Sequence, residues 1–159
     1  MLGLFLALSA QGVVVHVCQQ TAAGGVTNQI SDTVLQTGMP WETQTAPAVN
    51  DYIFTHWTIS TEQSFAARDE WGRAYDAPTF MLYEETTLTA HYLPVMQDAD
   101  NDGMADGYEI YWYGSLAETS ESDTDHDGYT FAQEVTNGTN PLMADEDIEG
   151  VIKYADGER

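Results

Sequence analysis

Basic residues are scarce in this chain. Its 159 residues include 4 Lys plus Arg against 26 Asp plus Glu, so the formal net charge at pH 7 is −22. Nucleic acids and anionic membrane surfaces bind proteins through basic patches. The charge balance therefore predicts no nucleic-acid partner and no attachment to an anionic membrane surface.

Cysteine is nearly lacking too. Cys18 is the only one, so an internal disulfide cannot form. Cys18 lies in a β-branched run and is expected to be a small buried hydrophobic residue in a strand. A disulfide to another chain is the alternative.

Long hydrophobic runs are missing as well. The apolar stretch at residues 1–10 reads MLGLFLALSA and is too short to span a bilayer, so no membrane insertion is expected. It could be the apolar part of a secretory signal, although no Lys or Arg precedes it. Its leucines alternate with other residues, so a strand would place them all on one face. We prefer this strand interpretation for the residues Leu2, Leu4, Leu6 and Leu8.

Known catalytic motifs do not occur. There is no Gly-x-Ser-x-Gly motif, no phosphate-binding glycine loop and no His/Cys cluster at zinc-ligand spacing. The charged residues of segment 68–73 are expected to form ordinary ion pairs on a helical surface. The four tryptophans could stack on sugars, but core packing is the expected role for most of them. We therefore expect that the protein is not an enzyme.

Residues 12–94 have the pattern of an antiparallel β domain. β-Branched or alternating runs predict strands at 12–18, 30–36 and 52–59. Segments 79–83 and 86–92 predict a hairpin that places Leu88, Ala90 and Tyr92 on one face. Segment 64–76 is the most helix-like part of this region.

The negative charge is concentrated after this region. Fifteen acidic residues lie between Asp98 and Glu149, and no Lys or Arg occurs between Arg73 and Lys153. Carboxylates at this density repel one another unless cations neutralise their charge. Two calcium ions would change the formal charge from −22 to −18 where the density is highest.

Two twelve-residue loops, 25 residues apart, carry acidic side chains at the spacing that calcium requires. Calcium binds six to eight oxygens, and alternate residues of a tight loop can direct carboxylates inward. Gly103 and Gly128 permit the sharp turn at position 6 of each loop. Position 7 of each loop is expected to contribute its backbone carbonyl as a ligand. The predicted ligands are Asp98, Asp100, Asp102, Met104, Asp106 and Glu109 in the first loop, and Asp123, Asp125, Asp127, Tyr129 and Glu134 in the second.

The two loops differ at position 9. The first loop has Asp106 there and the second has Phe131, so the first site is expected to bind calcium more tightly. His126, between two ligands, is expected to face solvent. Short helices are predicted after the loops at 105–113 and 130–136, with Gly114 and Gly138 at their C-terminal ends.

Segment 98–142 resembles the bacterial calcium repeats of thrombospondin type 3 and dockerin type, including the ending Asn-Gly-Thr-Asn-Pro-Leu. In thrombospondin-like arrays, acidic residues after this ending can join a neighbouring ion. The resemblance therefore implies Asp145 and Asp147 as further metal ligands. Asn137 within the ending also fits the N-glycosylation acceptor pattern.

Segment 12–94 is similar to the β-grasp repeats of bacterial surface proteins of the internalin B-repeat type. Phe54-Thr-His56-Trp57 and the threonine-rich run 86–92 carry this similarity. It implies a spacer or an adhesion module and no catalysis.

These patterns together predict an α+β, mainly β protein. An apolar N-terminal strand at 1–11 precedes a small antiparallel, β-grasp-like domain at 12–94, which is followed by a double calcium-loop module with two short helices at 95–144 and an acidic tail at 145–159. The expected function is an extracellular, calcium-stabilised subunit of a surface filament or adhesive fibre, in which each copy donates its N-terminal strand to the next. The alternative is a dockerin-like or carbohydrate-binding recognition module, with a protein partner or glycans as ligands.

Overall fold

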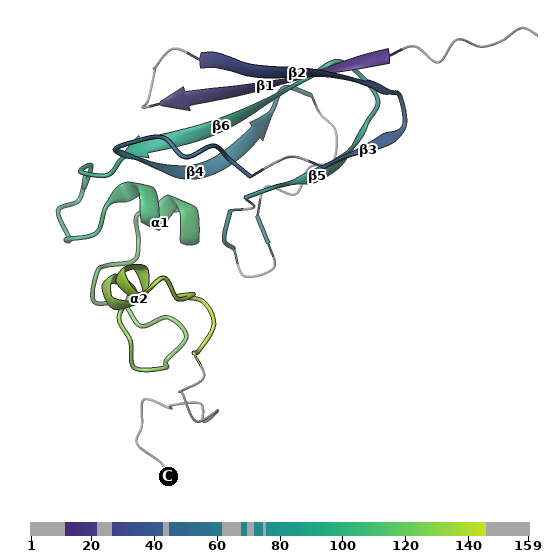
Figure 1. Ribbon diagram of the computed structural model, residues 1–159. Helices are drawn as coiled ribbons and strands as arrows, with labels where there is room; N and C mark the ends of the chain where they lie inside the picture. Colours follow the sequence, from purple (N-terminus) through teal and green to yellow (C-terminus); the bar gives the residue numbers. More distant parts are fainter. Residues whose placement is uncertain are drawn as a thin grey trace, which may run out of the picture.

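The computed structural model describes residues 12–21, 27–42, 45–61, 68–69, 72–74 and 76–145 (Figure 1). The proposed donor strand with Leu2, Leu4, Leu6 and Leu8 lies outside these ranges, as does Asp147. None of the helices in the described ranges is long and apolar enough to cross a membrane.

Four strands form the main sheet in the order β2-β1-β6-β4. They are β1 (Gly12–Thr21), β2 (Thr27–Gln36), β4 (Tyr52–Ile59) and β6 (Thr86–Pro94). β1 pairs with β2 and β4 pairs with β6 in antiparallel fashion, but β1 and β6 run parallel. The prediction of a purely antiparallel sheet is therefore wrong. A parallel pair needs a long crossover connection, which the chain between β1 and β6 provides; local sequence patterns do not reveal such a pairing. The mainly β, α+β class is correct, and the β-grasp-like detail stays a prediction.

A second sheet contains two short antiparallel strands, β3 (Met39–Glu42) and β5 (Thr79–Leu82). The predicted hairpin between 79–83 and 86–92 is wrong, because β5 pairs with β3 whereas β6 enters the main sheet. β3 was not predicted, since Pro40 argues against a central strand. A two-stranded sheet has only edge strands, and an edge position tolerates proline.

The core lies on one face of the main sheet. Leu88, Ala90 and Tyr92 of β6 are buried there, as the alternation predicts. Trp57 of β4 packs with them and donates a 3.0 Å hydrogen bond from its indole nitrogen to the carbonyl of Asp76. Cys18 is buried in β1, which confirms its expected role.

The predicted helix in segment 64–76 does not form at the described positions. Arg68 and Ala74 instead form an isolated antiparallel β-bridge, and Gly72 between them has a φ of 97°. The expected ion pair exists, with Arg73 Nε 3.0 Å from Asp69 Oδ2. The Arg68 guanidinium donates hydrogen bonds to the backbone carbonyls of Ile110 and Tyr111. These tertiary contacts hold Arg68 in place, and a local sequence pattern does not reveal them.

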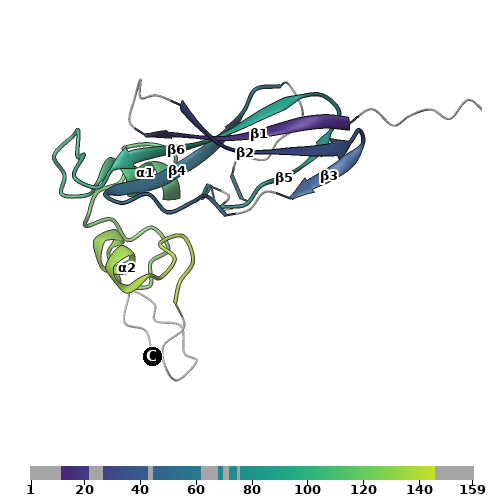
Figure 2. The same cartoon turned by 45° about the horizontal axis from the view of Figure 1, so that its top comes forward.

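Two helices follow the acidic loops, as predicted. They are α1 (Asp106–Trp112) and α2 (Phe131–Asn137). Thr130 and Gln133 form a capping box at the start of α2, and Gly138 ends it with a φ of 75°. Helix α1 packs beside β4 and β6, while α2 lies farther from the sheet (Figures 1 and 2).

Candidate metal centre

The two acidic loops have left-handed backbone conformations at the same two positions. Position 4 has a positive φ in both loops, 59° at Asn101 and 63° at His126, and position 6 does as well, 94° at Gly103 and 93° at Gly128. The glycines adopt this region without steric conflict. The sequence predicted the turn at position 6. It did not predict the left-handed conformation at position 4, which Asn and His adopt more often than most residues.

The helices begin in the same way after each loop. The amide of Asp106 donates to the carbonyl of Gln97 at 2.8 Å, and the amide of Phe131 donates to the carbonyl of Ser122 at 2.7 Å. Both bonds join position 9 to the residue just before the loop. A backbone hydrogen bond alone therefore closes each loop into a ring.

Asp side chains at positions 1, 3 and 5 accept hydrogen bonds from amides inside the loops. Asp98 accepts from the amides of Asp102 and Gly103, at 3.3 and 3.2 Å. In the second loop Asp123 accepts from Gly128 at 3.2 Å, and Asp125 accepts from Asp127 at 3.3 Å. These bonds hold the carboxylates together at the loop centre although all carry the same charge.

Position 12 is a fully buried glutamate in both loops. Glu109 and Glu134 each have 0% exposure, and among the residues that the structure describes neither carboxylate oxygen of either residue has a hydrogen-bond partner. Buried polar atoms are normally paired, and a buried charge without a partner is strongly unfavourable. Unpaired buried oxygens also occur on three aspartates of the loops. Within the described ranges, the unpaired buried side-chain atoms are Asp102 Oδ2, both Glu109 oxygens, Asp123 Oδ1, Asp125 Oδ2 and both Glu134 oxygens.

The loop carboxylates lie close enough to share an ion. Their ligand oxygens fall within 4.8 Å of one another in four groups. All donors are hard oxygen atoms, which suit calcium, and there is no His or Cys among them to favour zinc. The residues present therefore fit a calcium ion in each loop. The four groups are Asp98–Asp100–Asp106, Asp100–Asp102–Glu109, Asp123–Asp125–Asp127 and Asp127–Glu134–Asp145.

Electrostatics at the two glutamates support the same conclusion. Burial, followed by repulsion from neighbouring loop aspartates, raises the pKa of Glu109 to about 7 and that of Glu134 to about 8. Burial and neighbouring carboxylates also raise the pKa of Asp100 and of Asp125. A divalent cation among these groups would reverse the effect, because an opposite charge at short range stabilises the ionised form.

Asp106 lies at position 9 of the first loop, as predicted, but both of its oxygens already have protein partners. Oδ1 accepts from the amide of Ala99 at 2.8 Å, and Oδ2 accepts from the side-chain amide of Gln97 at 2.6 Å. Its exposure is 2%, so these bonds are shielded from water. Asp106 thus fastens the start of the loop to the start of α1 in addition to any contact with an ion.

The second loop has no side-chain oxygen at position 9, but a carboxylate from outside the loop lies beside it. Phe131, at position 9, is fully buried and packs edge-to-face on Tyr113, with ring centroids 5.1 Å apart. Asp145, beyond the loop, joins Asp127 and Glu134 in one carboxylate group, and its amide donates to Asp127 Oδ2 at 2.9 Å. The chain therefore folds back on the second loop and brings a carboxylate to it.

The remaining predicted residues lie as follows. The amides of Met104 and Tyr129, whose carbonyls are the predicted position 7 ligands, donate to Asp102 and Asp127, at 2.8 and 2.9 Å. The side chain of His126 is exposed, as expected. Asn137 is also exposed, at the last position of α2.

A contact between the two loops was not predicted. Ser120 Oγ donates a 3.0 Å hydrogen bond to the carbonyl of Asp102, and the Ser120 carbonyl accepts from the amide of Ala132. A serine in a short linker has no distinctive sequence signal. Ser120 therefore links the two loops.

Comparison with known proteins identifies the second loop. Residues 123–144 match the family model of the bacterial TSP3 repeat, which confirms the resemblance to thrombospondin type 3 repeats. No curated protein and no solved structure matches the chain. TSP3 repeats are structural, calcium-binding repeats typical of extracellular proteins, and they are not enzymatic. The match therefore supports a calcium-binding extracellular protein.

Proposed function

We propose that the chain is an extracellular structural protein whose residues 95–144 form a module that folds around two calcium ions and stiffens the end of a β domain at 12–94. The observation that supports this most directly is the pair of fully buried glutamates, Glu109 and Glu134, whose four carboxylate oxygens have no hydrogen-bond partner in the described part of the chain. Calcium would supply the missing partner in each loop. The first ion would be held by Asp98, Asp100, Asp102, Glu109 and the carbonyl of Met104, and the second by Asp123, Asp125, Asp127, Glu134, Asp145 and the carbonyl of Tyr129.

Helix α1 would transmit the effect of the first ion to the sheet. Glu109 belongs to α1, and the same helix packs against β4 through Gly107 and Ile53. When the first loop folds around its ion, it would therefore hold in place a helix that packs on the β domain. This is the geometry expected of a mechanical element that stiffens when calcium is present.

Calorimetric titration with calcium, joined to thermal melts, tests this proposal. We expect two calcium ions per chain and a melting temperature that rises with calcium concentration, because an ion that binds only the folded state stabilises it by mass action. A chelator should lower the melting temperature to a plateau. Equal melting with calcium and with chelator would contradict the proposal.

For the assembly, we propose that the strand with Leu2, Leu4, Leu6 and Leu8 pairs with a sheet edge of another copy and builds an open filament. Strand β2 is a suitable acceptor, because it is ten residues long and has a neighbour, β1, on one side only within the described part of the chain. Val34 on this strand is 67% exposed and Ile30 is 43% exposed. An added strand would satisfy the open backbone edge and cover these side chains. Because the contact is head-to-tail and does not close, it would produce a fibre.

Deletion of residues 1–10 tests the assembly. The truncated protein should remain monomeric by analytical ultracentrifugation and form no fibres under negative-stain electron microscopy, whereas the full chain forms them. Val34→Lys, placed on the acceptor strand, should also block assembly while calcium binding stays unchanged. Fibres formed equally well by the truncated protein would exclude strand donation.

A further inference from the structure

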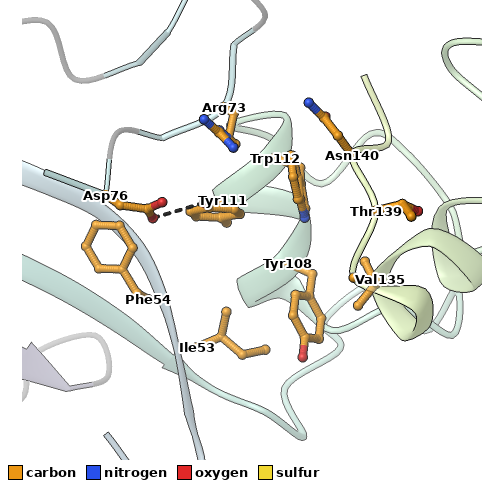
Figure 3. A pocket seen from close by; sticks show the side chains of 11 residues that line it. Ile53, Phe54, Arg73, Asp76, Tyr108, Tyr111, Trp112, Val135, Thr139 and Asn140 are labelled. Atoms are coloured by element: carbon orange, nitrogen blue, oxygen red, sulfur yellow. Dashed lines mark hydrogen bonds between the residues drawn. The ribbon is translucent and has the colours of Figure 1, made fainter. Parts of the chain in front are cut away.

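A cleft lies between the β sheet and the two loop helices. Its volume is about 440 Å³, within the roughly 300–1,000 Å³ typical of ligand pockets. One wall is formed by α1 and the other by the end of α2 with the residues after it, while the strand β4 forms the floor (Figure 3). The side chains that matter most are Tyr108 and Trp112 on α1, Arg73 and Asp76 beside them, and Thr139 and Asn140 opposite.

We infer that this cleft binds a neutral sugar unit of an oligosaccharide, and that calcium in the two loops shapes it. This inference rests on the proposed calcium binding. The first argument is the composition of the cleft. Tyr108 and Trp112 are partly exposed and lie along the side of α1 that faces the cleft (Figure 3). Flat aromatic rings with nearby polar groups match the alternating C–H faces and hydroxyl edges of a pyranose ring.

The polar groups around the rings retain hydrogen-bonding capacity. Asp76 Oδ1 accepts from the Tyr111 hydroxyl at 2.9 Å, and Oδ2 has no partner among the described residues. Asn140 Oδ1 accepts from the amide of Leu142 at 3.1 Å, which orients its NH₂ group as a free donor within the described part of the chain. One acceptor and one donor at opposite sides of an aromatic surface suit hydroxyl groups.

Charge argues for a neutral ligand. The carboxylates of the chain, at a net charge of −22, would repel an anionic ligand. A cationic ligand would meet Arg73, whose guanidinium carbon lies 5.7 Å from the centre of the Trp112 ring and already occupies one face of it. Arg73 is held there by Asp69 through a 3.0 Å ion pair. A neutral, hydroxyl-rich ligand avoids both conflicts.

Each wall of the cleft is attached to a different calcium loop. Tyr108 and Trp112 flank Glu109 on α1, and Val135 on the opposite wall directly follows Glu134 on α2. If the loops open when their ions leave, the two walls separate. Calcium and sugar should therefore bind cooperatively, and by thermodynamic reciprocity the sugar should tighten calcium binding by the same factor.

The test uses the full chain on an array of neutral oligosaccharides, read with calcium and with a chelator. Oligosaccharides that bind are then titrated in solution by tryptophan fluorescence and calorimetry. We expect binding in calcium, a loss of at least about tenfold with chelator, and a loss of similar size in Trp112→Ala and Tyr108→Ala. Tyr83→Ala, which removes an exposed aromatic side chain outside the cleft, is the matched control and should bind as the unmodified protein does.

Calcium titration of every variant separates the two proposals. Unchanged calcium binding with reduced sugar binding in the α1 variants supports the cleft. Normal calcium binding without any oligosaccharide binding would contradict sugar binding in the cleft and would leave the proposed calcium binding intact. Oligosaccharide binding that survives both Trp112→Ala and Tyr108→Ala, or that is equal in calcium and in chelator, also overturns it.

Discussion

At the scale of single residues, Glu109 and Glu134 combine full burial with unpaired oxygens. Each stands at position 12, the last predicted ligand position of its loop, and belongs to the helix that follows. A carboxylate in this position is unfavourable without a cation and favourable with one. Under the proposed function, each glutamate would therefore make the folding of its loop depend on calcium.

Glu134→Gln should weaken calcium binding at the second loop by more than about tenfold, because the amide loses the charge and one of two ligand oxygens. In the absence of calcium, the variant should be at least as stable as the unmodified protein, since the substitution removes a buried carboxylate whose oxygens have no partner among the described residues. Calorimetric titration and thermal melting in chelator measure the two effects. Glu84→Gln removes the same charge at an exposed site and serves as control. Unchanged calcium affinity in Glu134→Gln would show that this residue is not a ligand.

A second residue-scale feature is the stacked pair of histidines on the sheet. The rings of His56 on β4 and His91 on β6 are parallel within 7°, with centroids 4.6 Å apart. Burial, then the neighbouring His91 and Arg68, lowers the pKa of His56 to about 4, and burial lowers the pKa of His91. The pair is therefore neutral in the folded protein at neutral pH.

Stability should consequently fall as the pH decreases from about 6.5 to about 4. In this range the unfolded chain binds a proton at His56 that the folded chain does not bind, and the lowered pKa of His91 acts in the same direction, so the free energy of unfolding decreases with decreasing pH. Above the unfolded pKa, near 6.5, the effect disappears. Thermal melts in saturating calcium across this range measure it. The double variant His56→Asn/His91→Asn should show a shallower slope, and an equal slope would argue against the pair as its source.

At the scale of secondary-structure elements, α1 joins the first loop to the sheet. Gly107 lies against Ile53 of β4, so closely that a Cβ added at Gly107 would be 2.7 Å from the Ile53 Cβ. At the other end, Arg68 donates to the carbonyls of Ile110 and Tyr111. These contacts hold a helix of only seven residues, which would not be stable alone.

Gly107→Ala should therefore destabilise the protein by about 1–3 kcal/mol, because the added methyl group forces α1 away from β4. Alanine favours an isolated helix over glycine by up to about 1 kcal/mol, so the packing conflict must exceed that gain. Chemical denaturation in saturating calcium measures the difference. Asn137→Ala, on the exposed end of α2, is the control and should change stability little. A more stable Gly107→Ala variant would mean that α1 does not dock as tightly as the structure shows.

At the scale of the whole molecule, the sheet and the acidic loops differ in the interactions that stabilise them. The sheet has an apolar core that includes Val15, Trp57 and Leu88 and needs no ion. The loops have few buried apolar residues, chiefly Met104 and Phe131, and several buried carboxylates. They are joined to each other by Ser120 and by the Tyr113–Phe131 ring contact.

Removal of calcium should accordingly unfold the loop region while the sheet persists. Limited proteolysis in chelator is expected to cut within residues 98–145 and to leave a protected fragment that contains 12–94, identified by mass spectrometry. In calcium the same sites should resist cleavage. Cleavage within the sheet at the same rate as within the loops would mean that the two regions unfold as one unit.

Local sequence patterns determined the calcium loops, the helices that follow them and the buried face of β6. Ligand spacing and the glycine at position 6 are local requirements, because an ion and a tight turn each constrain a few consecutive residues. The faces of β6 follow from side-chain alternation for the same reason. These features could be read before any tertiary contact was known.

Only the tertiary structure decided which strands pair, how Arg68 and Ala74 are held and why a further carboxylate lies beside the second loop. The parallel pairing of β1 with β6, and the pairing of β5 with β3, depend on contacts between residues far apart in the chain. Asp145 reaches the second loop because the chain turns back after α2. Such contacts are selected by the burial and pairing of the whole fold, so no window of neighbouring residues contains them.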